Sequence, residues 1–114
     1  MRVLLDECVP RRLQPYIVGH ECQTAVKAGF AGKKNGALLS LAERAGYDVL
    51  LTVDRSVSFQ QKLQGRHMAV LVIHAKSNKL ADLLPHTEAC MKALKSIQSG
   101  EVVHVGDANH PARD

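Results

Sequence analysis

Length, composition and charge describe an ordinary globular chain. It has 114 residues, of which 46% are apolar and 23% are charged, a balance that excludes a wholly disordered or collagen-like protein. The net charge of +4 allows a polyanionic partner but does not require one. Aromatic residues make up 4% of the chain and tryptophan is absent, so a platform on which the bases of a single strand stack is not expected.

The apolar runs and the cysteines indicate a cellular compartment. No uninterrupted apolar run approaches the ~18 residues that a membrane span needs. The acidic pair Asp6-Glu7 ends the first apolar run too early for a signal peptide. We therefore expect a cytoplasmic protein without membrane association. Cys8, Cys22 and Cys90 are widely spaced and form no CxxC motif, which predicts reduced thiols rather than a zinc site or disulfides.

Short apolar runs alternate with helix-like spacings along the chain. The sequence predicts strands over 3–5, 20–25, 48–53, 68–73 and 101–105. It predicts helices from Pro10 to Gly19, from Asn35 to Ala45, from Asn78 to Leu84 and from Pro85 to Gly100. In the first of these helices, Leu13, Tyr16 and Ile17 are expected to share one buried face.

This alternation predicts an α/β layered fold with a largely parallel sheet and right-handed crossovers. The strands are almost uninterrupted apolar runs, as expected where helices cover both faces of a sheet. We expect one domain over 1–105, followed by a polar and loosely held tail over 106–114.

Two predicted strands end in carboxylates, Asp6 after the first and Asp54 after the third. If these strands are parallel neighbours, they lie about 4.8 Å apart, and the two side chains converge at one edge of the sheet. Carboxylates so close repel each other unless a cation or a proton lies between them. Mg²⁺ or Mn²⁺ suits such oxygen ligands and could activate water and clamp a phosphodiester. Alternatively, each carboxylate only caps the turn that follows it.

Polar residues around this pair are further candidates. Glu7 is either a third carboxylate of the site or a solvent-facing residue. Asn35 is an N-cap of its helix or a residue at the mouth of the site. Glu43, two turns further along that helix, is interpreted as a solvated residue. The six histidines show no close ligand spacing, and no glycine-rich phosphate loop is present.

The segment around Asp54 is rich in polar side chains. Thr52, Ser56 and Gln60 could hydrogen-bond a metal-bound water or a phosphate, and Arg55 could donate charge-assisted hydrogen bonds to a phosphate. Each of these residues is weak evidence alone, because polar turns commonly follow strands.

Several segments together resemble a known family. They are MRVLLDE at 1–7, GHE at 19–21, the helix that starts at Asn35-Gly36, and LLTVDR at 50–55. Over about 1–105 the chain resembles the compact PIN-like domains, which are related to the VapC-type toxin ribonucleases. The resemblance implies a three-layer α/β/α fold with a mainly parallel central sheet of about five strands. It also implies an acidic cluster that binds Mg²⁺ or Mn²⁺ and cleaves RNA.

The family pattern can be carried over position by position. Asp6 matches the first aspartate, and Asp54 matches the aspartate of the TxD segment. Asn35 and Ser56 stand where many relatives carry acidic residues. The implied metal ligands and catalytic residues are therefore Asp6, Glu7 and Asp54, with Asn35 as a neutral partner.

The resemblance implies a metal-dependent ribonuclease, and the toxin of a toxin–antitoxin pair is one role that it suggests, because some relatives are paired with an antitoxin. Its partners would be RNA and a cognate antitoxin protein, and relatives of this type often form homodimers. The candidates for contacting RNA are Arg11, Arg12, Lys33, Lys34, Arg55, Ser56 and Gln60.

Two other function classes stay open. A receiver domain also has an acidic pair after its first strand and a phospho-accepting aspartate after its third, but it carries a lysine after its last strand, and here none follows Val105. A catalytically degenerate PIN-like domain would act as a module that binds nucleic acid or protein. The neutral residues at Asn35 and Ser56 support that alternative, and metal affinity and RNA cleavage, rather than the fold, distinguish it from the active nuclease, which is the leading hypothesis.

Overall fold

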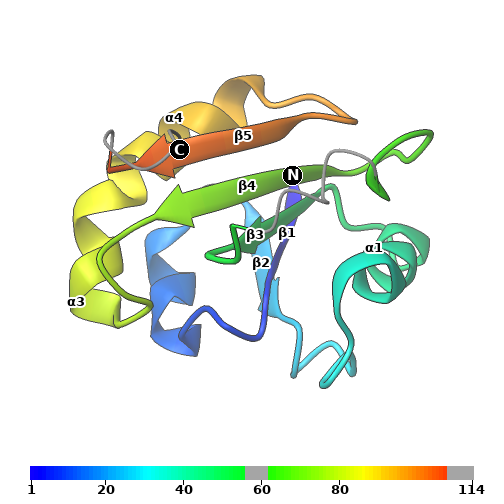
Figure 1. Ribbon diagram of the computed structural model, residues 1–114, viewed down its shortest axis with the longest axis horizontal. Helices are drawn as coiled ribbons and strands as arrows, with labels where there is room; N and C mark the ends of the chain where they lie inside the picture. The colour runs from blue at the N-terminus through cyan, green and yellow to red at the C-terminus, as the bar shows by residue number, and fades with distance from the viewer. Residues whose placement is uncertain (56–61, 108–114) are drawn as a thin grey trace.

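Five short strands form one parallel sheet in the computed structural model, which describes residues 1–55 and 62–107. The strand order is β2-β1-β3-β4-β5, and every neighbouring pair is parallel. The strands are β1 (Arg2–Leu5), β2 (Glu21–Thr24), β3 (Val49–Thr52), β4 (Ala69–His74) and β5 (Val102–Gly106) (Figure 1). The predicted α/β fold with a mainly parallel sheet of about five strands is confirmed.

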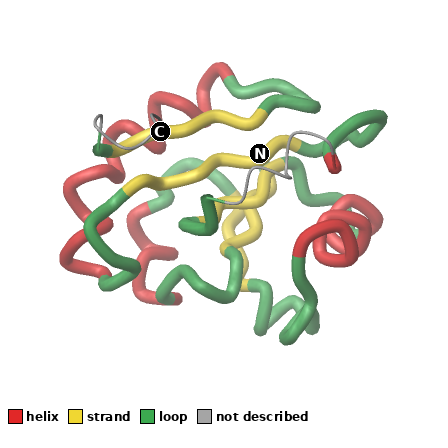
Figure 2. The backbone as a smooth tube through the Cα atoms, in the orientation of Figure 1, coloured by secondary structure: helices red, strands yellow, loops and turns green. Residues whose placement is uncertain are grey.

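Helices cover both faces of this sheet and complete three layers (Figure 2). They are η1 (Arg11–Tyr16), α1 (Asn35–Arg44), α3 (Leu80–Leu83), η2 (Leu84–His86) and α4 (Thr87–Ser96). The short 3-10 helix η1 packs with α3 and α4 on one face, and α1 packs on the other. Among the described residues, no helix is both long and apolar enough to cross a membrane.

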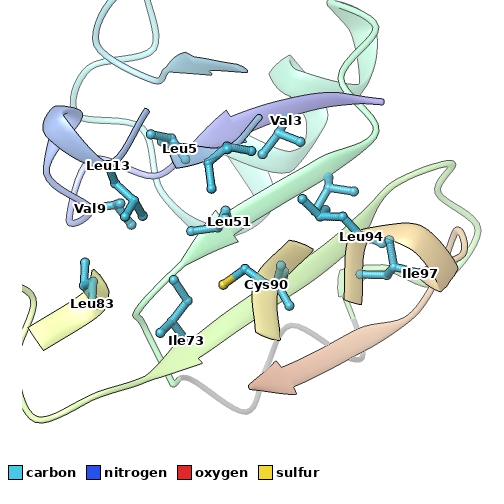
Figure 3. Packing of buried hydrophobic residues seen from close by; sticks show 14 of the residues in the cluster. Val3, Leu5, Val9, Leu13, Leu51, Ile73, Leu83, Cys90, Leu94 and Ile97 are labelled. Atoms are coloured by element: carbon cyan, nitrogen blue, oxygen red, sulfur yellow. The ribbon is translucent and has the colours of Figure 1, made fainter. Parts of the chain in front are cut away.

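Alternate residues of each strand enter separate hydrophobic cores. Val3 and Leu5 of β1 pack with Leu51 beneath η1 and α4 (Figure 3). Leu4 packs with Leu50 beneath α1. All five of these side chains are fully buried. Each contributes about 1.5–3 kcal/mol by leaving water. Burial on both faces explains why these strands are uninterrupted apolar runs rather than alternating ones.

The first predicted helix differs from the expectation. It is a 3-10 helix with Pro15 inside it, and proline removes a backbone donor and disfavours a continuous α-helix. Leu13 and Ile17 are buried as predicted, but Tyr16 is 46% exposed. The prediction of a shared face that includes Tyr16 is therefore wrong, because the tighter winding turns that side chain away from the sheet.

The capping role predicted for Asn35 is also wrong. The extended residue before α1 is Lys34, with φ −139° and ψ 159°, and Asn35 is the first helical residue. At the other end of the chain, Gly106 belongs to β5 rather than to the predicted tail. The rest of that tail beyond Asp107 lies outside the described residues.

Candidate functional site

The strand order reverses between β1 and β3, because the chain places β2 on one side of β1 and β3 on the other. In open α/β sheets, ligands bind outside the carboxyl ends of the strands at such a switch point. Leu5 and Leu51 are register partners at these ends, and the Asp6 backbone N–H donates to the Leu51 carbonyl at 2.9 Å. Asp6 therefore sits directly at the switch point, and Asp54 follows β3 by two residues.

Asp6 and Asp54 line the same open cleft, with a volume of about 560 Å³. The cleft brings together an acidic side and a basic side, which come from the ends of β1 and β3 and from the loop before α1. Its lining residues are Asp6, Glu7, Cys8, Gly32, Lys33, Lys34 and Asp54. The structure thus brings the two predicted carboxylates to one place.

The Thr52 side chain connects the segment that carries Asp6 with the segment that carries Asp54. Its side chain is fully buried, and its hydroxyl donates to Asp6 Oδ2 at 2.7 Å and accepts from the Asp54 backbone N–H at 3.0 Å. The Glu7 backbone N–H donates to the other Asp6 oxygen at 2.7 Å. Two donors therefore fix the orientation of the Asp6 carboxylate. The sequence signal for this role is a lone polar residue in an otherwise apolar buried strand.

Glu7 lies in the cleft rather than facing away from the site. Its Oε1 accepts from the Gly32 backbone N–H at 2.9 Å, so it ties the loop before α1 to the end of β1. One side-chain oxygen is thus engaged in structure, and the carboxylate remains part of the cleft wall.

The donor set fits a single hard cation better than an all-protein cage. Within residues 1–55 and 62–107, no group of three or more His, Cys, Asp or Glu side chains is arranged to hold a metal ion. Asp6, Glu7 and Asp54 nevertheless supply the oxygen ligands that Mg²⁺ and Mn²⁺ prefer. A carboxylate has about four lone-pair sites, so Asp6 retains capacity beyond its two hydrogen bonds. Mg²⁺ commonly binds through one or two carboxylates and keeps several waters.

The residues predicted to contact RNA do not all line the carboxylate cleft. Lys33 and Lys34 line the carboxylate cleft, and Arg11 lines an adjacent cleft. Arg12 is exposed on η1. Arg55 is also exposed, but its Nη2 donates to the Ala75 carbonyl at 2.9 Å, so the backbone after β4 holds its guanidinium.

For three of the predicted site residues, the structure describes no side chain. Ser56 and Gln60 lie outside the described residues, and for Asn35 only the backbone position at the start of α1 is given. The prediction that Glu43 is only a solvated residue is wrong. It accepts from Arg66 Nη1 at 3.3 Å and from the His67 backbone N–H at 2.8 Å, and so joins α1 to the segment before β4.

Cys8 is a residue of the cleft that the sequence did not single out. Its Sγ lies 3.4 Å from the Thr52 hydroxyl. Burial raises the pKa of the Cys8 thiol above its ordinary value, which keeps it protonated at neutral pH. A protonated thiol is a poor nucleophile, and the partly buried Cys8 side chain packs against the hydrophobic core on this side of the sheet. As predicted, all three cysteines are free.

His74, the last residue of β4, contacts His104 in the middle of β5. His74 Nε2 lies 2.7 Å from His104 Nδ1. The sequence did not predict this contact, because the two histidines are 30 positions apart and meet only through the register between β4 and β5. The nearby His86 Nε2 lies 3.5 Å from Asp107 Oδ1.

Comparison with protein-family models, with curated proteins and with solved structures found no match for this chain. Membership of the PIN-like family therefore stays a prediction from the sequence. What the chain can do has to be argued from its own site.

Proposed function

We propose that this chain is a metal-dependent ribonuclease of the PIN-like type. The observation that carries the proposal is the shared cleft at the switch point, which is lined by Asp6 and Asp54 together with Lys33 and Lys34. Carboxylates supply ligands for a divalent cation, and lysines attract phosphates. A phosphodiester backbone is a substrate that uses both halves of this cleft.

Each group has a distinct role in the proposed hydrolysis. Asp6 and Asp54 hold the cation, with Glu7 as a further oxygen ligand. When bound, Mg²⁺ or Mn²⁺ supplies Lewis acidity that activates water and offsets charge on the phosphate. Thr52 keeps the Asp6 carboxylate in one orientation, and Lys33 and Lys34 bind the RNA backbone. Positioning of this kind is a main source of rate acceleration.

The biological setting of the proposal comes from the PIN-like resemblance. A ribonuclease of this kind acts in the cytoplasm as the toxin of a toxin–antitoxin pair, and a protein antitoxin is its partner. A homodimer is the expected assembly. These expectations are testable by co-purification with the product of a neighbouring reading frame.

A receiver-type phosphoacceptor is the second candidate, because one observation favours it. The strand order β2-β1-β3-β4-β5 is also the order of the flavodoxin-like folds, which include receivers. Against it, the segment from Val102 to Asp107 contains no lysine. Incubation with a small acyl phosphate separates the two functions, since only a receiver would form an acid-stable, hydroxylamine-labile phosphate on Asp54.

Cleavage of a mixed RNA pool tests the nuclease. The wild type is incubated with Mn²⁺, with Mg²⁺ and with a chelator, beside Asp6→Asn and Asp54→Asn. Glu88→Gln is the matched control, because Glu88 is an exposed carboxylate on α4 that lines neither cleft. The proposal requires metal-dependent cleavage that both aspartate variants lose and the control retains. Absent cleavage, or cleavage that the aspartate variants retain, would instead favour a degenerate binding module.

A further inference from the structure

The sheet has two edge strands, β2 and β5, which lie at its opposite sides (Figure 1). An edge strand has backbone N–H and C=O groups that point away from its single neighbour, and such a row can accept a further strand. The two backbone groups of one strand residue point to the same side, and successive residues alternate between the sides. The two edges of this sheet differ in how their outward groups are used.

On β2, the residues that face outward are Cys22 and Thr24. The Ala25 backbone N–H donates to the carbonyl of Leu5 on β1 at 2.8 Å. Ala25 therefore faces β1, and Thr24 and Cys22, one and three positions earlier, face away from it.

The chain itself covers this outward row of β2. The side chain of Gln14 donates from Nε2 to the Cys22 carbonyl. The Thr24 backbone N–H donates to Gln23 Oε1 at 3.1 Å, and the Ala28 backbone N–H donates to the Thr24 carbonyl at 3.0 Å. Because these groups are already paired, β2 is a poor site for the addition of another strand.

On β5, the residues that face outward are Val102 and His104. The Val70 backbone N–H on β4 donates to the Glu101 carbonyl at 2.9 Å, so Glu101 faces β4 and the alternate residues Val102 and His104 face away. Within residues 1–55 and 62–107, neither of these two residues has a backbone hydrogen bond on its outward side. The strand also contains neither lysine nor proline, the residues by which edge strands commonly resist pairing.

The side chains of β5 suit a covered strand better than an exposed edge. Val102, Val103 and Val105 are all partly exposed. Val103 and Val105 pack against the core beneath η1 and α4, and Val102 packs against the core beneath α1. β-Branched residues on both faces are typical of a strand that has neighbours on both sides.

We infer that β5 of a second copy of this chain pairs antiparallel with this edge, about a twofold axis that passes beside Val103. In this register Val102 lies opposite His104 of the partner, and each such pair exchanges two N–H···O bonds. Val103 lies opposite the same residue of the partner in a non-hydrogen-bonded pair, where side chains approach most closely. The two sheets then form one continuous sheet, and every outward group of Val102 and His104 has a partner.

Charge and backbone conformation select this register. A twofold axis beside His104 would instead place Glu101 opposite Asp107 of the partner, and both residues are exposed. Like charges directly opposite each other destabilise a pair of strands. That register would also need Gly106, whose φ of +110° is far from an extended conformation. The axis beside Val103 avoids both conflicts, so the strand is its own complement and a second copy fits this edge.

Sedimentation velocity over a concentration series up to about 1 mM tests the pairing. A contact this small belongs to the weak class of interfaces, so we expect a Kd on the order of micromolar. His104→Pro removes the outward N–H and leaves the hydrogen bonds to β4, a position at which edge strands accept proline. It should weaken the dimer about 100-fold, because one hydrogen bond is lost in each copy, with roughly a tenfold effect each.

His104→Val is the matched control. It keeps the backbone N–H, and both variants lose the contact with His74. The control should form the dimer at least as tightly as the wild type, because valine favours strands. Far-UV circular dichroism and thermal melting verify that both variants are folded.

A disulfide tests the register. In a background with Cys8→Ser and Cys22→Ser, mild oxidation should join two copies of Val103→Cys, because the Cα atoms of a non-hydrogen-bonded pair lie about 4.5 Å apart. Val105→Cys is the control, since it would lie opposite Glu101 of the partner and should not cross-link.

The inference is overturned if the wild type stays a monomer throughout the series or if His104→Pro dimerises as tightly as His104→Val. It is also overturned if Val105→Cys cross-links as readily as Val103→Cys. A dimer that only His104→Pro weakens, and that Val103→Cys alone locks, supports it. These measurements need neither metal nor RNA, so their outcome does not depend on the proposed nuclease.

Discussion

Replacing Thr52 by valine isolates the hydroxyl that connects the two carboxylate segments. Valine keeps the shape of threonine and leaves no cavity, but it removes the donor to Asp6 Oδ2 and the acceptor for the Asp54 backbone N–H. A hydrogen bond to a charged group contributes about 1.5–3 kcal/mol, and a neutral one about 0.5–1.5 kcal/mol. Asp6 is only partly buried and Asp54 is exposed, so water replaces part of this loss. We expect a net destabilisation of about 2 kcal/mol.

Thermal unfolding measures this effect. For a domain of this size, 1 kcal/mol corresponds to a shift in Tm of about 4 °C, so Thr52→Val should melt roughly 8 °C below the wild type. Thr52→Ser is the matched control, because it keeps the hydroxyl and loses one buried methyl group, at a cost of about 0.8 kcal/mol. The stability order should be wild type, then serine, then valine.

Under the proposed nuclease function, the valine variant should also lose more metal-dependent cleavage than the serine variant, because Asp6 then keeps only the Glu7 backbone N–H as a donor. A valine variant as stable as the wild type, or more stable than the serine variant, would refute the reasoning. In that case the hydroxyl would be buried without supporting Asp6.

Three further measurements probe the rest of the fold. Gly106→Ala should cost more than about 2 kcal/mol in denaturant unfolding, because φ at Gly106 is +110° and a Cβ there would lie 2.1 Å from the His74 carbonyl oxygen. The His67 backbone N–H holds the pKa of Glu43 below its ordinary value of 4.5, so its contribution to stability is present above that pH and is lost as the pH falls through the lower folded value. Stability curves of the wild type and Glu43→Gln should therefore converge below pH 4.5 and stay apart at neutral pH; curves that stay parallel would contradict this. Burial raises the pKa of Cys90 to about 12, so thiol titration should detect Cys90 only after denaturant is added, and rapid labelling of the native protein would overturn its placement in the core.

The sequence was sufficient for the sheet and for the meeting of Asp6 with Asp54. Three consecutive residues of β3, Val49 to Leu51, are apolar and fully buried, a pattern typical of a parallel sheet that is covered on both faces. Once β1 and β3 are parallel neighbours, residues after their carboxyl ends have to lie at one edge. Both conclusions follow from the apolar runs in the sequence and from the rule that the carboxyl ends of neighbouring parallel strands lie at the same edge of a sheet.

Other features depend on contacts that no local pattern encodes. Pro15 changes the winding of η1, and this single residue decides where Tyr16 points. The role of Thr52 depends on the register between β1 and β3. The carboxylate cleft is formed by segments that meet only in the folded chain, because its lining residues come from the ends of β1 and β3 and from the loop before α1. Position in space, rather than residue type, gives these side chains their roles.

The place of β1 between β2 and β3 has a kinetic consequence. Its two neighbours, β2 and β3, both follow it in the chain, and α1 is completed before β3 reaches it. Closing such a long loop costs conformational entropy before the new contacts stabilise it, and folds with many non-local contacts form slowly. During refolding, helical signal should therefore recover before Asp6 and Asp54 share a cleft. Burial of the strand cores should be complete only in the final cooperative phase, which also assembles the cleft that Asp6 and Asp54 line.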